Sequence, residues 1–476
     1  MAEAAFSAGH LGELTRIVSP ELVDEVLAET KSVQQRVRLL PSRTVVYFLL
    51  AMTLFPESGY LGVWSSLVAG LAGASGDPSA TALRHARRRV GSAPLKLLFQ
   101  HLRGSVSSAT TLGVYWRSLH LAALDATTLA LADTPANSAH FGRVQGKNGA
   151  GGYPLARVSA IVECGTRALI DSAIAPLACG EATHAVGLLR SLRPGMLLLA
   201  DRAYDTYGLL RATADTGAHA LFRARGQRVL PVLHALPDGS WISFIPQPSH
   251  AHRLKAWLRR GGAPAQMHGL GVRVIEATIT TTDREGASRR STLRLITTLL
   301  DHTRYPAAEV TALYHERWEA ETAFFGLKVT LRGADRVLRS GTPHGVDQEI
   351  YAYLITYQAA RIAMCQAADH ADLDPDRLSF TVAVRAIRES VIIANCSPPP
   401  LRTVPEEPSR LAFTLLKPRN LHTSKRRQRT SDRAVKRPLS PYAYKSLSAN
   451  RRKRHTTTTV TITRASDSVL TNAAAA

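Results

Sequence analysis

Apolar residues recur at helical spacing in the first part of the chain. Leu22, Val23 and Val26 are separated by one and three positions, and apolar residues dominate residues 45–54. Because a helix turns about once every 3.6 residues, this spacing predicts helices with one buried face. We therefore expect residues 1–112 to form an all-helical N-terminal domain.

The segment SATALRHARRRV, residues 79–90, is a further predicted helix with a basic face. Asp77 is its expected N-cap and Pro78 its first helical residue. A short basic helix after a glycine-rich connection resembles the second helix of a helix-turn-helix. A solvated cationic face on an ordinary helix explains the same residues. Under the first interpretation, the side chains that contact DNA are Arg84, Arg87 and Arg88.

From about residue 117 the pattern changes to short runs typical of β-strands. LHLAALDATTLAL is followed by ARVSAIVEC and RALIDSAIAP, which predict a hairpin, and then by a helical stretch, the apolar run MLLLA, a short helix and AHALFRA. Three strands followed by alternating helix and strand match the order of a ribonuclease-H-like core, one candidate among several mixed α/β folds. Residues 113–224 are the expected first part of this core.

The rest of the chain divides into three predicted segments. Strand-like runs and turn signals at 225–302 indicate an inserted β-rich subdomain. Helical patterns return at 303–395, the second part of the core. Residues 396–476 are an expected polybasic, disordered tail, because 417–454 holds 14 Lys or Arg residues and one acid.

Composition adds a statement about partners. The 476 residues include 59 Lys and Arg, 49 of them Arg, against 37 Asp and Glu, for a net charge of +22. Such a surplus attracts nucleic acid or an anionic membrane surface. The 45% of apolar residues excludes wholesale disorder, and the length suggests about three structural units.

Cysteine usage and apolar runs bear on the cellular compartment. The four cysteines include no C-x-x-C pair and are too sparse for a disulfide framework. No signal peptide is recognisable at the N-terminus, and no uncharged run predicts a membrane span. These features predict a cytoplasmic protein.

Two aspartates interrupt or end apolar strands. Asp125 lies inside LAALDATTLAL, and Asp201 directly follows MLLLA. A buried carboxylate needs a partner or a metal, and ligands of α/β sheets bind at strand ends. The alternative is structural: Asp201 begins a turn and Asp125 marks a strand end.

The predicted helix LYHERWEAETAFFGLK offers three glutamates. At about 100° per residue, four residues share a stripe within about 60° of arc: Tyr314, Arg317, Glu321 and Lys328. Glu316 and Glu319 point to the other side. Glu321 is therefore the acid flanked by a phenol and two cations, although an ordinary ion-paired surface helix explains any one pair.

The spacing Y-x2-R-x3-E-x6-K of those four residues resembles the signature of DDE transposases of the insertion-element-four family. LDATTLALADTPANSAHFG resembles the first-aspartate region of the family, and LADRAYD resembles its second. FLLAMTLFPESGYLGVWSSL and ALRHARRRVG resemble the N-terminal domain. The resemblance covers about residues 10–370.

The resemblance implies an α/β fold: a ribonuclease-H-like catalytic core with an inserted β-rich subdomain, preceded by the helical domain. It implies that Asp125, Asp201 and Glu321 are the catalytic residues and bind two Mg²⁺ ions, for which Mn²⁺ can substitute. Three acids without a Cys or His cluster suit these hard cations. The residues expected to grip DNA phosphates are Arg202, Tyr314, Arg317 and Lys328.

The expected function is a transposase that binds the terminal inverted repeats of an insertion element, cleaves them and joins them to target DNA. Its expected partners are double-stranded DNA and a second copy of the chain in the synaptic complex, at the nucleoid and not at a membrane. One alternative is a non-catalytic DNA-binding protein derived from an inactive transposase. Another is a cationic protein that coats nucleic acid, although such a protein has no need of apolar strands that end in aspartates.

Overall fold

The computed structural model describes residues 10–36, 40–69, 78–146, 149–250, 269–282, 288–394, 409–422 and 457–464. The chain forms two compact units instead of the three that its length suggests. The first unit contains Met1–Ser191 and Trp318–His422, and the second contains Leu192–Arg317 and Thr423–Ala476. The first unit thus joins the predicted N-terminal domain to parts of both predicted halves of the core.

The first unit is mixed α/β. Its N-terminal helices are η1 (Gly12–Arg16), α1 (Pro20–Glu29), α2 (Ser42–Leu54), α3 (Tyr60–Val68), α4 (Ala80–Val90) and α5 (Ala93–Leu102). Its strands are β1 (Tyr115–Trp116), β2 (Leu119–Ala130), β3 (Val144–Gly146), β4 (Gly149–Gly151), β5 (Leu155–Glu163) and β6 (Leu169–Pro176). Its remaining helices are α6 (Pro135–Phe141), α7 (Glu181–Ala185), η2 (Val186–Ser191), α11 (Trp318–Phe325), η7 (Gly326–Leu331), α12 (Pro343–His370), η8 (Pro375–Arg377), α13 (Phe380–Ala394), α14 (Arg410–Leu416) and η9 (Pro418–Asn420).

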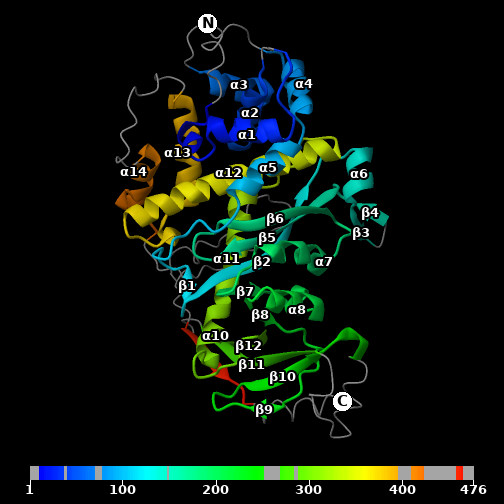
Figure 1. Cartoon of the computed structure of the whole chain (residues 1–476), viewed down its shortest axis with the longest axis vertical. Helices are drawn as coiled ribbons and strands as arrows, with labels where there is room; N and C mark the ends of the chain where they lie inside the picture. Colours follow the sequence, from blue (N-terminus) through cyan, green and yellow to red (C-terminus); the bar gives the residue numbers. More distant parts are fainter. Residues whose placement is uncertain are drawn as a thin grey trace. The chain divides into compact units, whose positions relative to one another are not determined.

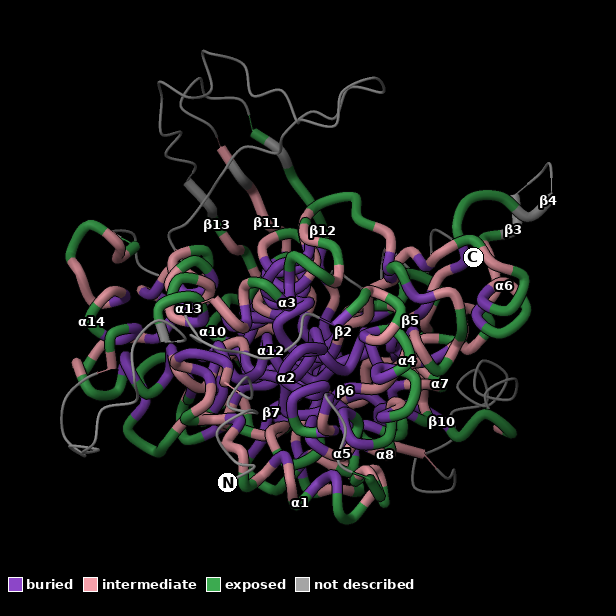
Figure 2. The backbone as a smooth tube through the Cα atoms, turned by 90° about the horizontal axis from the view of Figure 1, so that it is seen from above, coloured by how far each residue is buried: buried purple, intermediate pink, exposed green. Residues whose placement is uncertain are grey.

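The long helix α12 organises the first unit. Thr342 caps it and Pro343 occupies its first turn, a favoured helix start. It packs against α2 and α5, and Figure 1 shows it between the N-terminal helices and strands β2, β5 and β6. Most of its residues are buried, and α2 is almost completely buried as well (Figure 2). The N-terminal helices therefore share one core with the catalytic half of the unit.

Strands β2, β5 and β6 form an antiparallel meander in the first unit. The predicted hairpin is confirmed, with β5 and β6 paired and Ala160 opposite Ser172. On its other edge β5 pairs with β2, with Ala160 opposite Asp125. In the same unit, α11 packs against both β2 and β5.

The second unit begins with the predicted strand–helix–strand segment. Its elements are β7 (Met196–Ala200), η3 (Arg202–Tyr204), α8 (Tyr207–Asp215), β8 (His219–Arg223), β9 (His234–Ala235), β10 (Trp241–Pro246), η4 (Pro248–His250), β11 (Gly269–Thr282), β12 (Ser288–Thr297), α10 (Ala307–Leu313), η6 (Tyr314–Arg317) and β13 (Thr457–Ile462). β7 is buried throughout and pairs in parallel with β8, as expected for an apolar strand in an α/β sheet. β12 extends this sheet by pairing with β8, and antiparallel pairs then lead to β11, β10 and β9.

One predicted helix start is wrong, and the predicted tail is ordered in the parts that the structure describes. Helix α4 begins at Ala80, and its N-cap is Ser79, whose hydroxyl accepts a 3.1 Å hydrogen bond from the Ala82 amide; Asp77 lies outside the described residues. The expected disordered tail contains helix α14 and strand β13, which pairs with β11 along six residues. Its most basic part, 423–456, lies outside the described residues.

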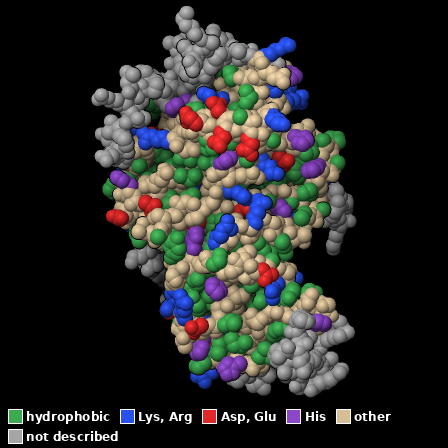
Figure 3. Space-filling view, viewed as in Figure 1, with side chains coloured by type: hydrophobic (Ala, Val, Ile, Leu, Met, Phe, Trp, Pro, Cys, Tyr) green, Lys and Arg blue, Asp and Glu red, His purple; other side chains and the backbone are tan. Residues whose placement is uncertain are grey.

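The described residues contain no helix long and apolar enough to cross a membrane. On the face seen in Figure 3, the described Lys and Arg side chains form separate groups among acidic and apolar side chains. Residues 417–454 contribute 14 minus 1, or +13, of the net +22, and most of them lie outside the described residues.

Candidate active site

Asp125 lies in the middle of β2, so the prediction that it marks a strand end is wrong. Residues 121–124 are buried, whereas Asp125 is half-buried, as are the three residues that follow. Its Oδ1 atom accepts a 2.8 Å hydrogen bond from the Ala126 amide. The carboxylate therefore sits at the start of a half-buried stretch between the buried residues 121–124 and Leu129.

Asp201 follows β7 directly and caps the short helix η3. Its Oδ1 atom accepts a 2.6 Å hydrogen bond from the Ala203 amide. The turn expected of a structural aspartate is thus present, and it holds the half-buried carboxylate at the carboxyl end of a parallel strand. That is the position at which α/β sheets bind ligands.

Tyr314 anchors the helical segment to the same end of β7. Its hydroxyl donates a 3.1 Å hydrogen bond to the carbonyl oxygen of Ala200. Burial raises the pKa of Tyr314 to about 12; the charge of Arg317 opposes this rise and the charge of Asp201 adds to it. The second unit therefore gathers Asp201, Tyr314 and Arg317. The phenol is buried and bonded to backbone, so Tyr314 has a structural contact beside its predicted role at the phosphates.

Arginines missed by the sequence reasoning shape the loop after Asp201. Arg225 donates to the carbonyl oxygens of Arg202 and Ala203 at 3.2 and 3.1 Å. Arg228 forms an ion pair at 2.7 Å with Asp205, whose carboxylate is fully buried. The signal in the sequence is R-x-R-x2-R at 223–228, immediately after an apolar strand. Arg202 itself is exposed.

The sequence predicts a single α-helix for the segment that carries Glu321, and the structure shows a helix of three types instead. It begins as the 3-10 turn η6, continues as the α-helix α11 and ends as the π-helix η7. The angles calculated at 100° per residue therefore do not hold along its length. π-Helical turns inside helices are frequent at functional sites, and this one contains Lys328.

The three glutamates of this segment have different surroundings. Glu316 is buried, at 2% exposure. Glu319 forms an ion pair with Arg167 in the turn between β5 and β6. Glu321 is half-buried on α11. The three glutamates therefore differ in exposure, with Glu316 the most buried.

Lys328 joins the glutamate segment to the strand of Asp125. Its Nζ atom donates a 3.0 Å hydrogen bond to Oγ1 of Thr127 on β2. Burial, followed by the charge of Arg332, lowers the pKa of Lys328. The first unit thus holds Asp125, Glu321 and Lys328 on elements that pack together.

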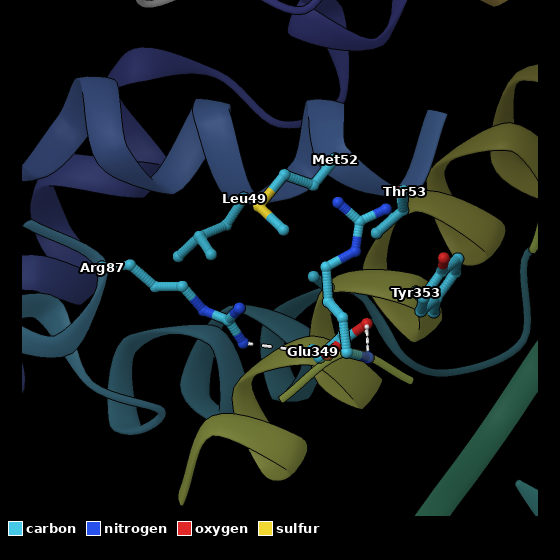
Figure 4. Close-up of a pocket in the computed structure, with 8 residues that line it drawn as sticks. Leu49, Met52, Thr53, Arg87, Glu349 and Tyr353 are labelled. Atoms are coloured by element: carbon cyan, nitrogen blue, oxygen red, sulfur yellow. Dashed lines mark hydrogen bonds and ion pairs between the residues drawn. The ribbon is translucent and has the colours of Figure 1, made fainter. Parts of the chain in front are cut away.

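Arg87, a predicted DNA contact, is a buried structural residue. It is 6% exposed, and its guanidinium donates to Gln348, Tyr60, Ser340 and the Gly345 carbonyl oxygen. Figure 4 shows it directed toward Glu349 of α12, with which it forms a 3.9 Å ion pair. Both line a cavity of about 10 Å³ beside α2, roughly enough for one water molecule. Arg84 and Arg88 are exposed on the same helix.

The three acids fit a hard divalent cation by their chemistry, since all their donors are carboxylate oxygens. Asp125 and Glu321 belong to the first unit and Asp201 to the second. Among the described residues, no group of three His, Cys, Asp or Glu side chains is placed to hold a metal ion.

Comparisons with known proteins identify the family. Residues 8–100 match the family described as insertion element 4 transposase N-terminal, and residues 116–358 match the transposase DDE domain. The transposase InsG for insertion sequence element IS4 of Escherichia coli is 28% identical over 372 residues, which cover 78% of this chain and 80% of that protein. A structure of the piggyBac transposase synaptic complex with hairpin DNA matches at a TM-score of 0.42 and 9% identity over 82% of each chain, a likeness too low to establish a shared fold.

The DDE match spans the strands of both aspartates and the segment of Glu321, and the N-terminal match spans the helices that share a core with α12. The mixed α/β architecture fits the ribonuclease-H-like core expected of such enzymes. The chain belongs to the DDE transposases of the insertion-element-four family and is a DNA-cleaving enzyme.

Proposed function

We propose that this transposase binds the terminal inverted repeats of its own insertion element, cleaves them and joins them to target DNA. The observation that carries the proposal is the DDE match across residues 116–358, which contains the two aspartates and Glu321. The packing of α11 on β2 supports it, because that contact brings the segment of Glu321 to the strand of Asp125.

Asp125, Asp201 and Glu321 are the proposed ligands of two Mg²⁺ ions, with Mn²⁺ as a substitute. When bound, such a pair of ions supplies activation of the attacking oxygen and stabilisation of the leaving 3′-oxygen. The chain itself holds the carboxylates in place: the Ala126 and Ala203 amides orient the two aspartates.

The cations beside these acids are the proposed grip on the DNA backbone. Arg202 is exposed next to Asp201, whereas Arg317 is buried beside Tyr314. Phosphate contacts of this kind set the register of a strand without reading its sequence. Tyr314 and Lys328 complete the proposed set of phosphate contacts, and Tyr314 also holds the end of β7 through its hydrogen bond to Ala200.

Recognition of the element ends is assigned to the N-terminal helices, with exposed Arg84 and Arg88 as contacts. Pairing two ends implies a homodimer during the reaction, at the nucleoid. The polybasic residues 417–454 add sequence-independent, salt-sensitive affinity. We propose that the five segments predicted from the sequence, 1–112, 113–224, 225–302, 303–395 and 396–476, are the functional regions of the chain.

The decisive experiment combines purified protein, a DNA fragment bearing an element end, and Mg²⁺. Asp125→Asn, Asp201→Asn and Glu321→Gln should each abolish cleavage while a mobility-shift assay still detects end binding. Glu389→Gln is the matched control, since this carboxylate is exposed and paired only locally with Arg385 among the described ion pairs. If Glu321→Gln cleaves at the wild-type rate, the assignment is wrong. If the wild-type protein binds ends but never cuts, the non-catalytic alternative holds.

A further inference from the structure

The turn between β5 and β6 carries an arginine in an unusual backbone conformation. Arg167 has φ of +62°, a region that side chains other than glycine rarely occupy. Its amide donates a 2.8 Å hydrogen bond to the carbonyl oxygen of Glu163, which closes the hairpin. The turn thereby places Arg167 at the tip of the hairpin.

That guanidinium bridges two acids on different helices. Its Nε atom donates to Glu319 on α11, and its Nη2 atom donates to Asp376 on η8. Asp376 is buried, with a side-chain exposure of 1%, and the side chains of Arg167 and Glu319 are only 11% and 12% exposed. Glu319 is two residues from Glu321, so the bridge grips the helix next to the proposed metal ligand.

The same turn is linked to the π-helix beyond Glu321. The carbonyl oxygen of Arg167 accepts a 2.9 Å hydrogen bond from the Tyr357 hydroxyl, which accepts a 2.9 Å bond from Nε of Arg361. The Arg361 guanidinium stacks 4.2 Å from the ring centre of Phe380. A methyl group at Gly326, the first residue of η7, would approach that ring to 3.2 Å and Arg361 to 3.3 Å.

These contacts hold the glutamate segment on both sides of Glu321, at Glu319 and at Gly326. Buried charges contribute little stability compared with apolar packing of the same volume. The contacts at Glu319 and Gly326 instead restrict the rotation of α11 about its axis. One residue of slippage would rotate Glu321 by about 100°, and misplacement by about 1 Å is enough to disable a reacting group.

We propose that Arg167 is a positioning residue that sets the rotation of α11, and thereby the direction of the Glu321 carboxylate, through its bridge between Glu319 and Asp376. The proposal rests on the proposed role of Glu321 as a metal ligand. It assigns to Glu319 the role of an acceptor for Arg167 and not that of a ligand.

The test compares substitutions at 167, 319 and 321 in the full chain. Mn²⁺ binding is measured by calorimetry, and cleavage is followed as Mg²⁺ is varied. Arg167→Lys keeps the charge but cannot donate to two acids at once. The affinity for Mn²⁺ should therefore fall by about 10–100-fold, as for other residues that orient metal ligands. The Mg²⁺ concentration that gives half-maximal cleavage should rise by a similar factor. End binding should persist. Arg211→Lys, in an exposed pair with Asp215, is the matched control and should change neither.

Position 319 separates positioning from ligation. Glu319→Gln retains an acceptor for Arg167, so its Mn²⁺ affinity should stay near that of the wild type. Glu319→Ala removes the acceptor, and its Mn²⁺ affinity should fall as much as that of Arg167→Lys. The proposal is overturned if Arg167→Lys lowers only the thermal midpoint, or if Glu319→Gln removes Mn²⁺ binding as completely as Glu321→Gln. If Glu321→Gln changes neither Mn²⁺ binding nor cleavage, the proposed role of Glu321 as a metal ligand is wrong.

Discussion

Lys328 donates a 3.0 Å hydrogen bond from its ammonium to the hydroxyl of Thr127. Thr127 lies two residues beyond Asp125 on β2, and Lys328 lies seven residues beyond Glu321. One side-chain contact therefore links the two segments of the first unit that carry proposed metal ligands.

Replacing the acceptor tests this link. Thr127→Val removes a partner of a half-buried ammonium, and we expect the free energy of unfolding to fall by about 1–3 kcal/mol. Thr128→Val is the control, because neighbouring strand residues face opposite sides of the sheet. Denaturant unfolding of the two variants measures the difference. Equal losses would mean that the contact adds nothing specific.

The lowered pKa of Lys328 predicts a pH dependence of stability. Burial disfavours the charged form in the folded protein, whereas the unfolded chain keeps the ordinary pKa of 10.5. Between the two values the unfolded chain binds more protons, so stability should increase as pH rises through this interval. Thermal midpoints measured at a series of alkaline pH values should show a rise in the wild type that is missing in Lys328→Met. A parallel course for both proteins would contradict the assignment.

Glu163 should make the protein sensitive to acid. Burial alone would raise the pKa of this carboxyl, but hydrogen bonds from His120, Ser105, Ser107 and Thr166 hold it below the ordinary 4.5. Its contribution to stability is therefore present above about pH 4.5 and lost as pH falls through the lowered folded value. Glu163→Gln should be less stable than the wild type at neutral pH, with a difference that shrinks under acid, as followed by urea unfolding. A difference independent of pH would disprove this account.

Substitutions at Arg87 should lower stability, whereas substitutions at Arg84 and Arg88 should weaken DNA binding. Arg87→Ala removes the guanidinium that pairs with Glu349 and donates to Gln348, and it should cost about 3–5 kcal/mol of unfolding free energy. Arg84→Ala and Arg88→Ala, both exposed, should stay within about 0.5 kcal/mol but weaken end binding. Thermal unfolding and mobility shifts on the three proteins check both statements. An unchanged midpoint for Arg87→Ala would contradict the buried role.

Strand β13 changes what truncation is expected to do. A chain that ends after residue 456 loses the strand that pairs with residues 277–282 of β11, which exposes an edge of the β-rich region. We expect a lower thermal midpoint than for a chain that ends after residue 464, which keeps the strand. If the two truncated proteins melt together, the pairing does not contribute to stability.

Local pattern determined much of this protein. The run MLLLA and the β5–β6 hairpin follow from apolar runs and turn residues, because strand formation is read at short range. The order of the motifs around Asp125, Asp201 and Glu321 was sufficient to indicate a DDE transposase. The net charge pointed to a polyanion partner but not to a reaction.

Only the tertiary structure decided which polar residues face inward. Arg84, Arg87 and Arg88 look alike in the sequence, yet Arg87 alone meets Gln348 and Ser340, which lie more than 250 positions away. Glu319 is likewise distinguished from Glu321 by its hydrogen bond from the guanidinium of Arg167, which lies in a hairpin distant in sequence. The change from 3-10 to α to π geometry along the glutamate segment also escapes a fixed angular period. Burial, ion pairing and helix winding depend on partners remote in sequence, so no local pattern specifies them.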